Sequence, residues 1–134
     1  MKKVVLVLTL GLVASPVKAE AVYLVCTLTA ESGASSNFAV AFDEEAQTMS
    51  YTTPKGYVKK LPNVVFNPND VVGSESSSSS SGMLTVEQWE ISRVTGAVIR
   101  TYTMSVPRYP QLRGGEPMVS NGTCSPVKAE PRKF

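Results

Sequence analysis

The stretch MLTVEQWEISRVTGAVIRTYTM, residues 83–104, decides the fold class of this chain. It consists of two runs rich in β-branched and aromatic residues, joined by a short segment in which Gly96 takes a positive φ at no steric cost. This pattern predicts a β-hairpin. The apolar positions of the first run change sides around Gln88, which predicts a bulge or a twisted strand there.

Other segments carry the same strand signal. Residues 37–43 alternate between a large apolar face and a small face made of Ala39 and Ala41, as a half-buried strand does. The small outer face leaves space for a second layer or a partner. Shorter β-rich runs lie at 22–28, 48–52, 64–66 and 118–124. The sequence therefore predicts an all-β fold, a small antiparallel meander or barrel of six to eight strands.

The N-terminal segment has the features of a bacterial signal peptide. Lys2 and Lys3 precede a ten-residue apolar run, too short to span a bilayer, and Ala19 offers a small residue for cleavage. We expect cleavage after Ala19; a retained N-terminal anchor is the alternative. The chain then divides into a signal peptide (1–19), a single β domain (20–124) that contains a flexible Ser-rich loop (73–82), and a polar C-terminal tail (125–134).

The charge balance changes when the signal peptide is removed. The full chain has 13 basic and 11 acidic residues, and the signal peptide holds three of the lysines, so the mature chain has 10 basic and 11 acidic residues. A net charge of about −1 argues against nucleic acid as a partner. We expect a periplasmic or secreted protein with no stable membrane anchor after cleavage; its oligomeric state is left open.

The two cysteines are Cys26, near the mature N-terminus, and Cys124, near the C-terminus. In an exported domain such a pair is most simply a disulfide, which would join the first strand to the last. Closing a loop of roughly 100 residues is worth about 4–5 kcal/mol in the loop-entropy model. A metal site is disfavoured because the chain has no His and no C-x-x-C, and lipidation because Val25 is not the small residue a lipobox requires.

The residue content argues against an enzyme. The chain has no His, no Gly-rich phosphate loop and no metal-ligand spacing, so we expect no cofactor and no catalytic residue. The leading hypothesis is an exported, non-enzymatic binding or interaction module of the bacterial envelope, with an envelope protein or polymer as partner. The candidate binding residues are Arg108, Tyr109 and Arg113 on the irregular Pro/Gly-rich segment 106–117, followed by Tyr57, Lys59 and Lys60.

Three alternatives stay open. A carboxylate-dependent hydrolase would need two acidic groups facing one cleft, drawn from Asp43, Glu44 and Glu45 together with Glu87 or Glu90. The same acidic turn could hold calcium, although the spacing of a calcium loop is missing. A subunit of a surface assembly would use the apolar-to-small face of residues 38–42. Arg93 is expected to pair with Glu87 or Glu90 and to set the register of the hairpin.

The hairpin segment Ile91-Ser92-Arg93-Val94-Thr95-Gly96, taken with Gly122-Thr123-Cys124, resembles small uncharacterised exported bacterial β proteins with an Ile-x-Arg-x-Thr-Gly turn and a terminal Gly-x-Cys. The resemblance implies a fold and a compartment and no activity. Periplasmic lysozyme inhibitors are similar in size, disulfide and barrel. Their Ser-Gly-x-x-Tyr loop is not matched, since neither Ser32-Gly33 nor Ser81-Gly82 is followed by Tyr at the required position.

Overall fold

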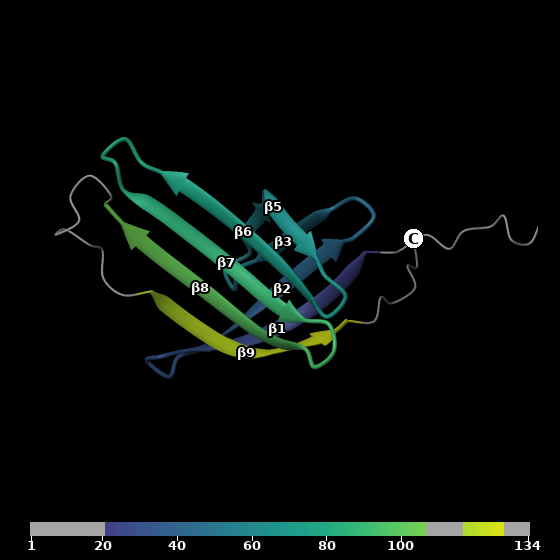
Figure 1. Cartoon of the computed structure of the whole chain (residues 1–134). Helices are drawn as coiled ribbons and strands as arrows, with labels where there is room; N and C mark the ends of the chain where they lie inside the picture. Colours follow the sequence, from purple (N-terminus) through teal and green to yellow (C-terminus); the bar gives the residue numbers. More distant parts are fainter. Residues whose placement is uncertain (1–20, 107–116, 128–134) are drawn as a thin grey trace, which may run out of the picture.

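The computed structural model describes residues 21–106 and 117–127, which form nine β-strands (Figure 1). The strands are β1 (Val22–Ala30), β2 (Ser35–Asp43), β3 (Thr48–Thr52), β4 (Val58–Leu61), β5 (Asn63–Phe66), β6 (Asp70–Ser78), β7 (Leu84–Ser92), β8 (Ala97–Ser105) and β9 (Met118–Pro126). The predicted all-β class is confirmed. Over these described ranges, no helix has the length and apolarity needed to cross a membrane.

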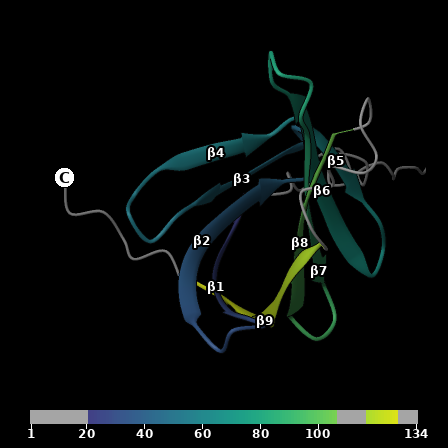
Figure 2. The same cartoon turned by 90° about the vertical axis from the view of Figure 1, so that its left-hand side faces the viewer.

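All nine strands belong to one antiparallel sheet in the order β4-β3-β2-β1-β9-β8-β7-β6-β5. Its two edge strands, β4 and β5, follow each other in the chain with one residue, Pro62, between them. The segment 58–66 thus pairs with β3 in its first half and with β6 in its second, and the sheet curls into a nearly closed barrel (Figure 2). This division of one segment, at a residue without an N–H, raises the strand number to nine, above the predicted six to eight.

The predicted hairpin is present as β7 and β8, but the predicted bulge is wrong. The two strands pair without interruption from Leu84 opposite Ser105 to Ile91 opposite Val98. The apolar pattern changes sides at Gln88 because an inward position of β7 is occupied by a charged residue, Glu87, which is fully buried.

The Ser-rich segment 73–82 is a loop only in its last part, which corrects the prediction. Residues up to Ser78 belong to β6 and pair with β7 as far as Ser78 opposite Leu84. The turn that follows is closed by a hydrogen bond from the Gly82 amide to the Ser79 carbonyl, 3.0 Å. The low strand propensity of serine is overridden because β7 offers a complete set of backbone partners. Likewise, β9 extends through Pro126, beyond the predicted start of the tail at Ser125.

The core lies inside the barrel and is built from alternate residues of the strands. Trp89 of β7 is completely buried and makes edge contacts with Phe38 of β2, with ring centres 5.4 Å apart, and a tilted contact with Tyr51 of β3 at 4.8 Å. The other buried apolar residues are Leu24, Cys26, Leu28, Val40, Phe42, Met49, Leu61, Val71, Ile91, Val98 and Cys124.

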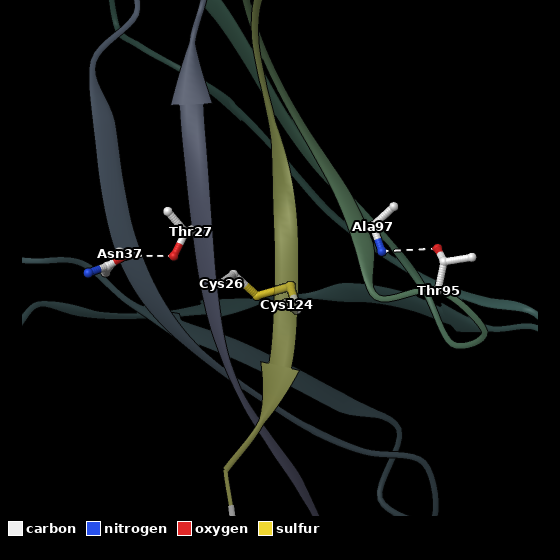
Figure 3. Close-up of a disulfide and its surroundings, with 6 residues drawn as sticks. All are labelled: Cys26, Thr27, Asn37, Thr95, Ala97 and Cys124. Atoms are coloured by element: carbon white, nitrogen blue, oxygen red, sulfur yellow. Dashed lines mark hydrogen bonds between the residues drawn. A yellow bond between two sulfur atoms is a disulfide. The ribbon is translucent and has the colours of Figure 1, made fainter.

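The predicted disulfide between Cys26 and Cys124 is present and joins the first strand to the last (Figure 3). The two residues are direct partners in the β1–β9 ladder, with Cα atoms 3.9 Å apart. Close approach of the strands depends on Gly122, because a Cβ there would overlap the carbonyl oxygen of Thr27. The strands of the sheet centre are therefore linked both by backbone pairing and by a covalent bond.

The barrel has two ends, named here the mouth and the base. The mouth carries the turns 31–34, 53–57 and 79–83, and there β8 ends and β9 begins. The base carries the turns 44–47, 67–69 and 93–96 together with the start of β1 and the end of β9.

Candidate functional site

A cluster of charged and aromatic side chains fills the barrel interior on the mouth side of the core. Its centre is the carboxylate of Glu87, a residue that is only 1% exposed. The Tyr51 hydroxyl donates to Oε2 at 2.7 Å and lies 2.9 Å from Oε1, and Trp89 Nε1 donates to Oε2 at 3.2 Å. Arg100 donates to Oε2 through Nε and Nη2, at 2.8 and 2.7 Å. Lys59 Nζ lies 3.2 Å from Oε1.

The Arg100 guanidinium is fixed by aromatic rings as well as by Glu87. Its central carbon lies 5.3 Å from the ring centre of Phe38, 5.6 Å from that of Tyr51 and 5.4 Å from that of Trp89. Cation–π contacts of this kind stabilise a cation that is partly removed from water. These contacts fix the Arg100 side chain in position. The side chain nevertheless retains 26% exposure, so part of it reaches the surface.

Lys59 connects parts of the barrel that no backbone ladder joins. It lies on β4, and its Nζ pairs with Glu75 of β6 at 2.7 Å in addition to Glu87 of β7. Strands β4 and β6 are not neighbours in the hydrogen-bonded order, so these ion pairs hold the barrel closed beside the break between β4 and β5. Deeper along the same break, Leu61 and Met49 pack against Gly73, whose missing side chain gives them space.

The interactions of the cluster shift the protonation equilibria of its members. Burial raises the pKa of Glu87, but the hydrogen bonds from Tyr51 and Arg100 and the charge of Arg100 outweigh burial, so the pKa of this carboxyl lies below its ordinary value. Burial and the hydrogen bond to Glu87 raise the pKa of Tyr51 to about 12. The hydrogen bond to Glu75 raises the pKa of Lys59. At neutral pH Glu87 is therefore a carboxylate, Lys59 is a cation and Tyr51 is a neutral phenol.

A pocket of about 560 Å³ opens at the mouth, next to this cluster. Its wall includes inward positions of β1, β8 and β9, namely Ala30, Arg100, Tyr102, Met118 and Ser120, and its rim includes Glu31 and Ser32 of the β1–β2 turn. Arg100 therefore takes part in both: its guanidinium binds Glu87 in the buried cluster, and the residue is also part of the pocket wall. Arginine in such a position binds carboxylate or phosphate oxygens well.

Arg93 bridges turns at the base, beside a pocket of about 370 Å³ that it helps to line, which corrects its predicted pairing with Glu87 or Glu90. Its Nη2 pairs with Glu44 Oε1 at 2.7 Å, and its Nη1 donates to the Asn67 carbonyl at 2.8 Å. Arg93 therefore ties the β7–β8 turn to the β2–β3 and β5–β6 turns. The reason is directional, because Arg93 lies in the turn beyond the end of β7 and reaches across the base rather than back along the strand.

The acidic turn serves local structure. Asp43 Oδ1 accepts a hydrogen bond from the Ala46 amide at 3.1 Å, and Glu44 is the partner of Arg93. Over residues 21–106 and 117–127, no group of three or more acidic, Cys or His side chains is arranged to hold a metal ion.

The other predicted site residues are distributed as follows. Tyr57 is exposed in the β3–β4 turn at the mouth. Lys59 and Lys60 are neighbours on β4 and point to opposite faces, so the predicted basic cluster is divided: Lys59 takes part in the Glu87 cluster, and Lys60 is exposed. The predicted binding residues Arg108, Tyr109 and Arg113 lie outside the described residues.

The sequence reasoning missed Arg100 and the central role of Glu87. The signal was present, since Arg100 has the same strand parity as the apolar Val98, and Glu87 has that of Trp89 and Ile91. Two opposite charges on the inward faces of adjacent strands predict an internal ion pair. Because a buried charge is rare, the change of sides around Gln88 instead predicts a bulge or a twisted strand.

Comparison with protein-family models, with curated proteins and with solved structures finds no match to this chain.

Proposed function

We propose that this protein is an exported, non-enzymatic binding module of the bacterial envelope that takes hold of a protein or polymer at the mouth of its barrel. The observation that carries the proposal is the position of Arg100, a firmly held cation that lines the mouth pocket. The Cys26–Cys124 disulfide supports an oxidising compartment, periplasmic or extracellular.

Arg100 has donors to spare for a ligand. Its bonds to Glu87 use one N–H on Nε and one on Nη2, whereas a guanidinium carries five. Because the rings of Phe38, Tyr51 and Trp89 already fix its position, binding costs little side-chain entropy. The fitting ligand group is an acceptor such as a carboxylate, with Tyr102 and Met118 providing apolar contact beside it.

One segment that the sequence favours for recognition lies at the mouth, and the strands that flank a second one end and begin there. Tyr57 is 71% exposed on the β3–β4 turn, and the segment with Arg108, Tyr109 and Arg113 connects two strands that end and begin at the mouth. Loops grouped at one end of a rigid barrel are the common location of binding residues. The pocket and the described turns 31–34 and 53–57 therefore lie at the same end of the barrel.

The alternatives receive less support. Glu87 is committed to its surrounding donors and is held ionised, so it is poorly suited to act as a general acid, and Glu44 is paired with Arg93 at the opposite end. For a lysozyme inhibitor, Ser32-Gly33 and Ser81-Gly82 each belong to a tight turn in which the glycine has positive φ, which accounts for both pairs by turn geometry.

The experiment is a comparison of capture between matched variants. The purified, oxidised protein is immobilised, incubated with the envelope fraction of its expression host, and the retained components are quantified by mass spectrometry. Tyr57→Ala changes an exposed side chain at the mouth, and a double Arg108→Ala/Tyr109→Ala variant changes two residues of the connection between β8 and β9. Val94→Ala changes a side chain of similar exposure, 74%, in the β7–β8 turn at the base.

We expect the two mouth variants to lose the same retained components while their melting temperatures stay unchanged, and the Val94→Ala variant to retain them. Equal retention by all variants would exclude Tyr57, Arg108 and Tyr109 as binding residues, and a loss confined to Val94→Ala would assign binding to the base instead of the mouth. A fall in melting temperature that parallels the lost capture would assign Tyr57 or Arg108 and Tyr109 to structure.

A further inference from the structure

The outer wall formed by β9, β1, β2 and β3 is nearly free of charge. On these strands, residues that point into the core alternate with residues that point outward. The outward residues of β9, β1 and β3 are all uncharged. On β2 the outward positions carry one charge, Asp43, at the last residue. The outward residues are Tyr23, Val25, Thr27, Thr29, Ser35, Asn37, Ala39, Ala41, Asp43, Thr48, Ser50, Thr52, Val119, Asn121, Thr123 and Ser125. An ordinary surface carries charges of both signs at close spacing.

A shallow hollow of about 610 Å³ lies within this wall. Ala39 and Ala41 of β2 line it, together with two small polar residues of β3. Beside it stand three larger side chains that remain exposed: Tyr23 at 54%, Val25 at 44% and Val127 at 47%.

Tyr23 and Val25 form a ridge of exposed side chains on β1. The pairing of β1 with β2 places this ridge directly beside the hollow. Tyr23 is opposite Ala41 and Val25 is opposite Ala39, so large and small side chains alternate across the two strands. Exposed apolar side chains that lie side by side in a patch mark a protein-interaction surface.

We propose that this wall, defined by Tyr23, Val25, Ala39, Ala41 and Val127, is the interface of a homodimer in which a second copy of this chain presents the same wall. The occupant follows from complementarity. A charged partner would bury charge against the centre of the wall, where no counter-charge lies, so the partner's face must be uncharged there as well.

The shape of the wall is also compatible with a two-fold symmetric dimer. An isologous contact needs a surface that complements itself. The wall contains a ridge and an adjacent hollow, so the Tyr23 and Val25 ridge of one copy can enter the Ala39 and Ala41 hollow of the other, and the reverse. At the margins Lys60 and Asp43 carry one charge of each sign, so two copies meet without net repulsion. The dimer leaves the mouth accessible and does not depend on the proposed binding function.

The test is sedimentation velocity of the oxidised protein over a wide concentration range. We expect a dimer that dissociates on dilution. Val25→Lys places a cation on the ridge at an exposed position, and Ala41→Lys places one in the hollow; since the two-fold axis doubles each charge, both should weaken the dimer about a hundredfold or more. Ile99→Lys is the control, because Ile99 is 42% exposed on the outward face of β8, outside the wall.

A protein that remains monomeric up to millimolar concentration overturns the proposal. So does a dimer that persists in Val25→Lys, or one that Ile99→Lys disrupts as strongly. Should Ala41→Lys fail to fold by circular dichroism, Val25→Lys still decides the matter, because its side chain does not enter the core.

Discussion

The amide of Cys124 donates a hydrogen bond to the carbonyl of Gly96, with the two atoms 2.7 Å apart. This bond joins the turn between β7 and β8 to the disulfide between β1 and β9. Figure 3 shows Thr95 and Ala97, the neighbours of Gly96, on the strand side that faces Cys124. Gly96 has a φ of 79°, and a Cβ on it would come within 2.6 Å of the Cys124 carbonyl oxygen. The two sequence motifs that gave the resemblance, the hairpin turn and the terminal Gly-x-Cys, thus meet in one place and have structural roles.

Replacing Glu87 by Gln should destabilise the barrel by about 3–5 kcal/mol, because it removes one half of a buried ion pair and leaves Arg100 and Lys59 without their shared counter-charge. Chemical denaturation measures the loss. The control is Glu90→Gln on the same strand, which removes an exposed carboxylate and should change stability by less than about 0.5 kcal/mol. Equal effects of the two changes would mean that the cluster contributes no special stability.

The cluster also predicts how stability depends on pH. Glu87 has a lowered pKa in the fold, so its contribution is present above the pKa of the unfolded chain and is lost as pH falls through the folded value. Tyr51 has a pKa raised to about 12, so its contribution is present below about pH 10 and is lost as pH rises from there toward 12. Melting temperatures across pH should therefore fall on both sides. Glu87→Gln should flatten the acid side; an unchanged acid side would contradict this assignment.

Gly122→Ala should destabilise the protein by more than about 3 kcal/mol, since the new methyl group overlaps the Thr27 carbonyl and forces β9 away from β1. Gly33→Ala is the matched control. Gly33 has a φ of 94° with open space around it, so that change costs backbone strain alone, about 1–2 kcal/mol. Should Gly122→Ala be the milder change, the close approach of the two strands would not be required.

Removing Arg93 should loosen the base. Arg93→Ala loses the contacts to Glu44 and to the Asn67 carbonyl, and we expect faster amide exchange in the turns 44–47 and 67–69 with unchanged exchange in the turns of the mouth. Arg93→Lys keeps the charge but cannot reach both partners with a planar fork, so its effect should be intermediate. Uniform acceleration throughout the barrel would indicate global rather than local opening.

The export prediction has a direct mass signature. The protein expressed with its own N-terminal segment and recovered without reductant from the periplasm or medium should begin at Glu20 and be two hydrogens lighter than the reduced chain, because Cys26 and Cys124 are joined. Intact mass spectrometry measures both. A full-length mass would contradict cleavage, and two free thiols would contradict the role of the disulfide in the exported protein.

The sequence is sufficient for the fold class and for the disulfide. Alternation at Phe38, Val40 and Phe42 identifies an inward face that the structure confirms, and the terminal cysteines predict the link between first and last strands. The division of segment 58–66 is not predictable from local pattern, because it depends on two strands from distant parts of the chain, β3 and β6, competing for one segment.

The candidate site is predictable only in part, for a physical reason. Tyr57 is exposed in its turn, as a polar loop predicts, but its role in binding stays a prediction. The sequence predicts Lys59 and Lys60 to act together, whereas strand geometry sends neighbouring side chains to opposite faces. Arg100 and Glu87 acquire meaning only as a pair, and the pairing depends on the register of the hairpin, which a bulge would have changed.

The measurement that tests the central claim most directly is amide hydrogen exchange, followed by mass spectrometry, on the oxidised protein with and without the envelope fraction. If the mouth is the binding surface, protection should appear in the turns 31–34, 53–57 and 79–83 and leave the turns 44–47, 67–69 and 93–96 unchanged. Protection confined to the base, or none in any turn at saturating envelope material, would contradict a binding module that acts through Arg100 and the mouth.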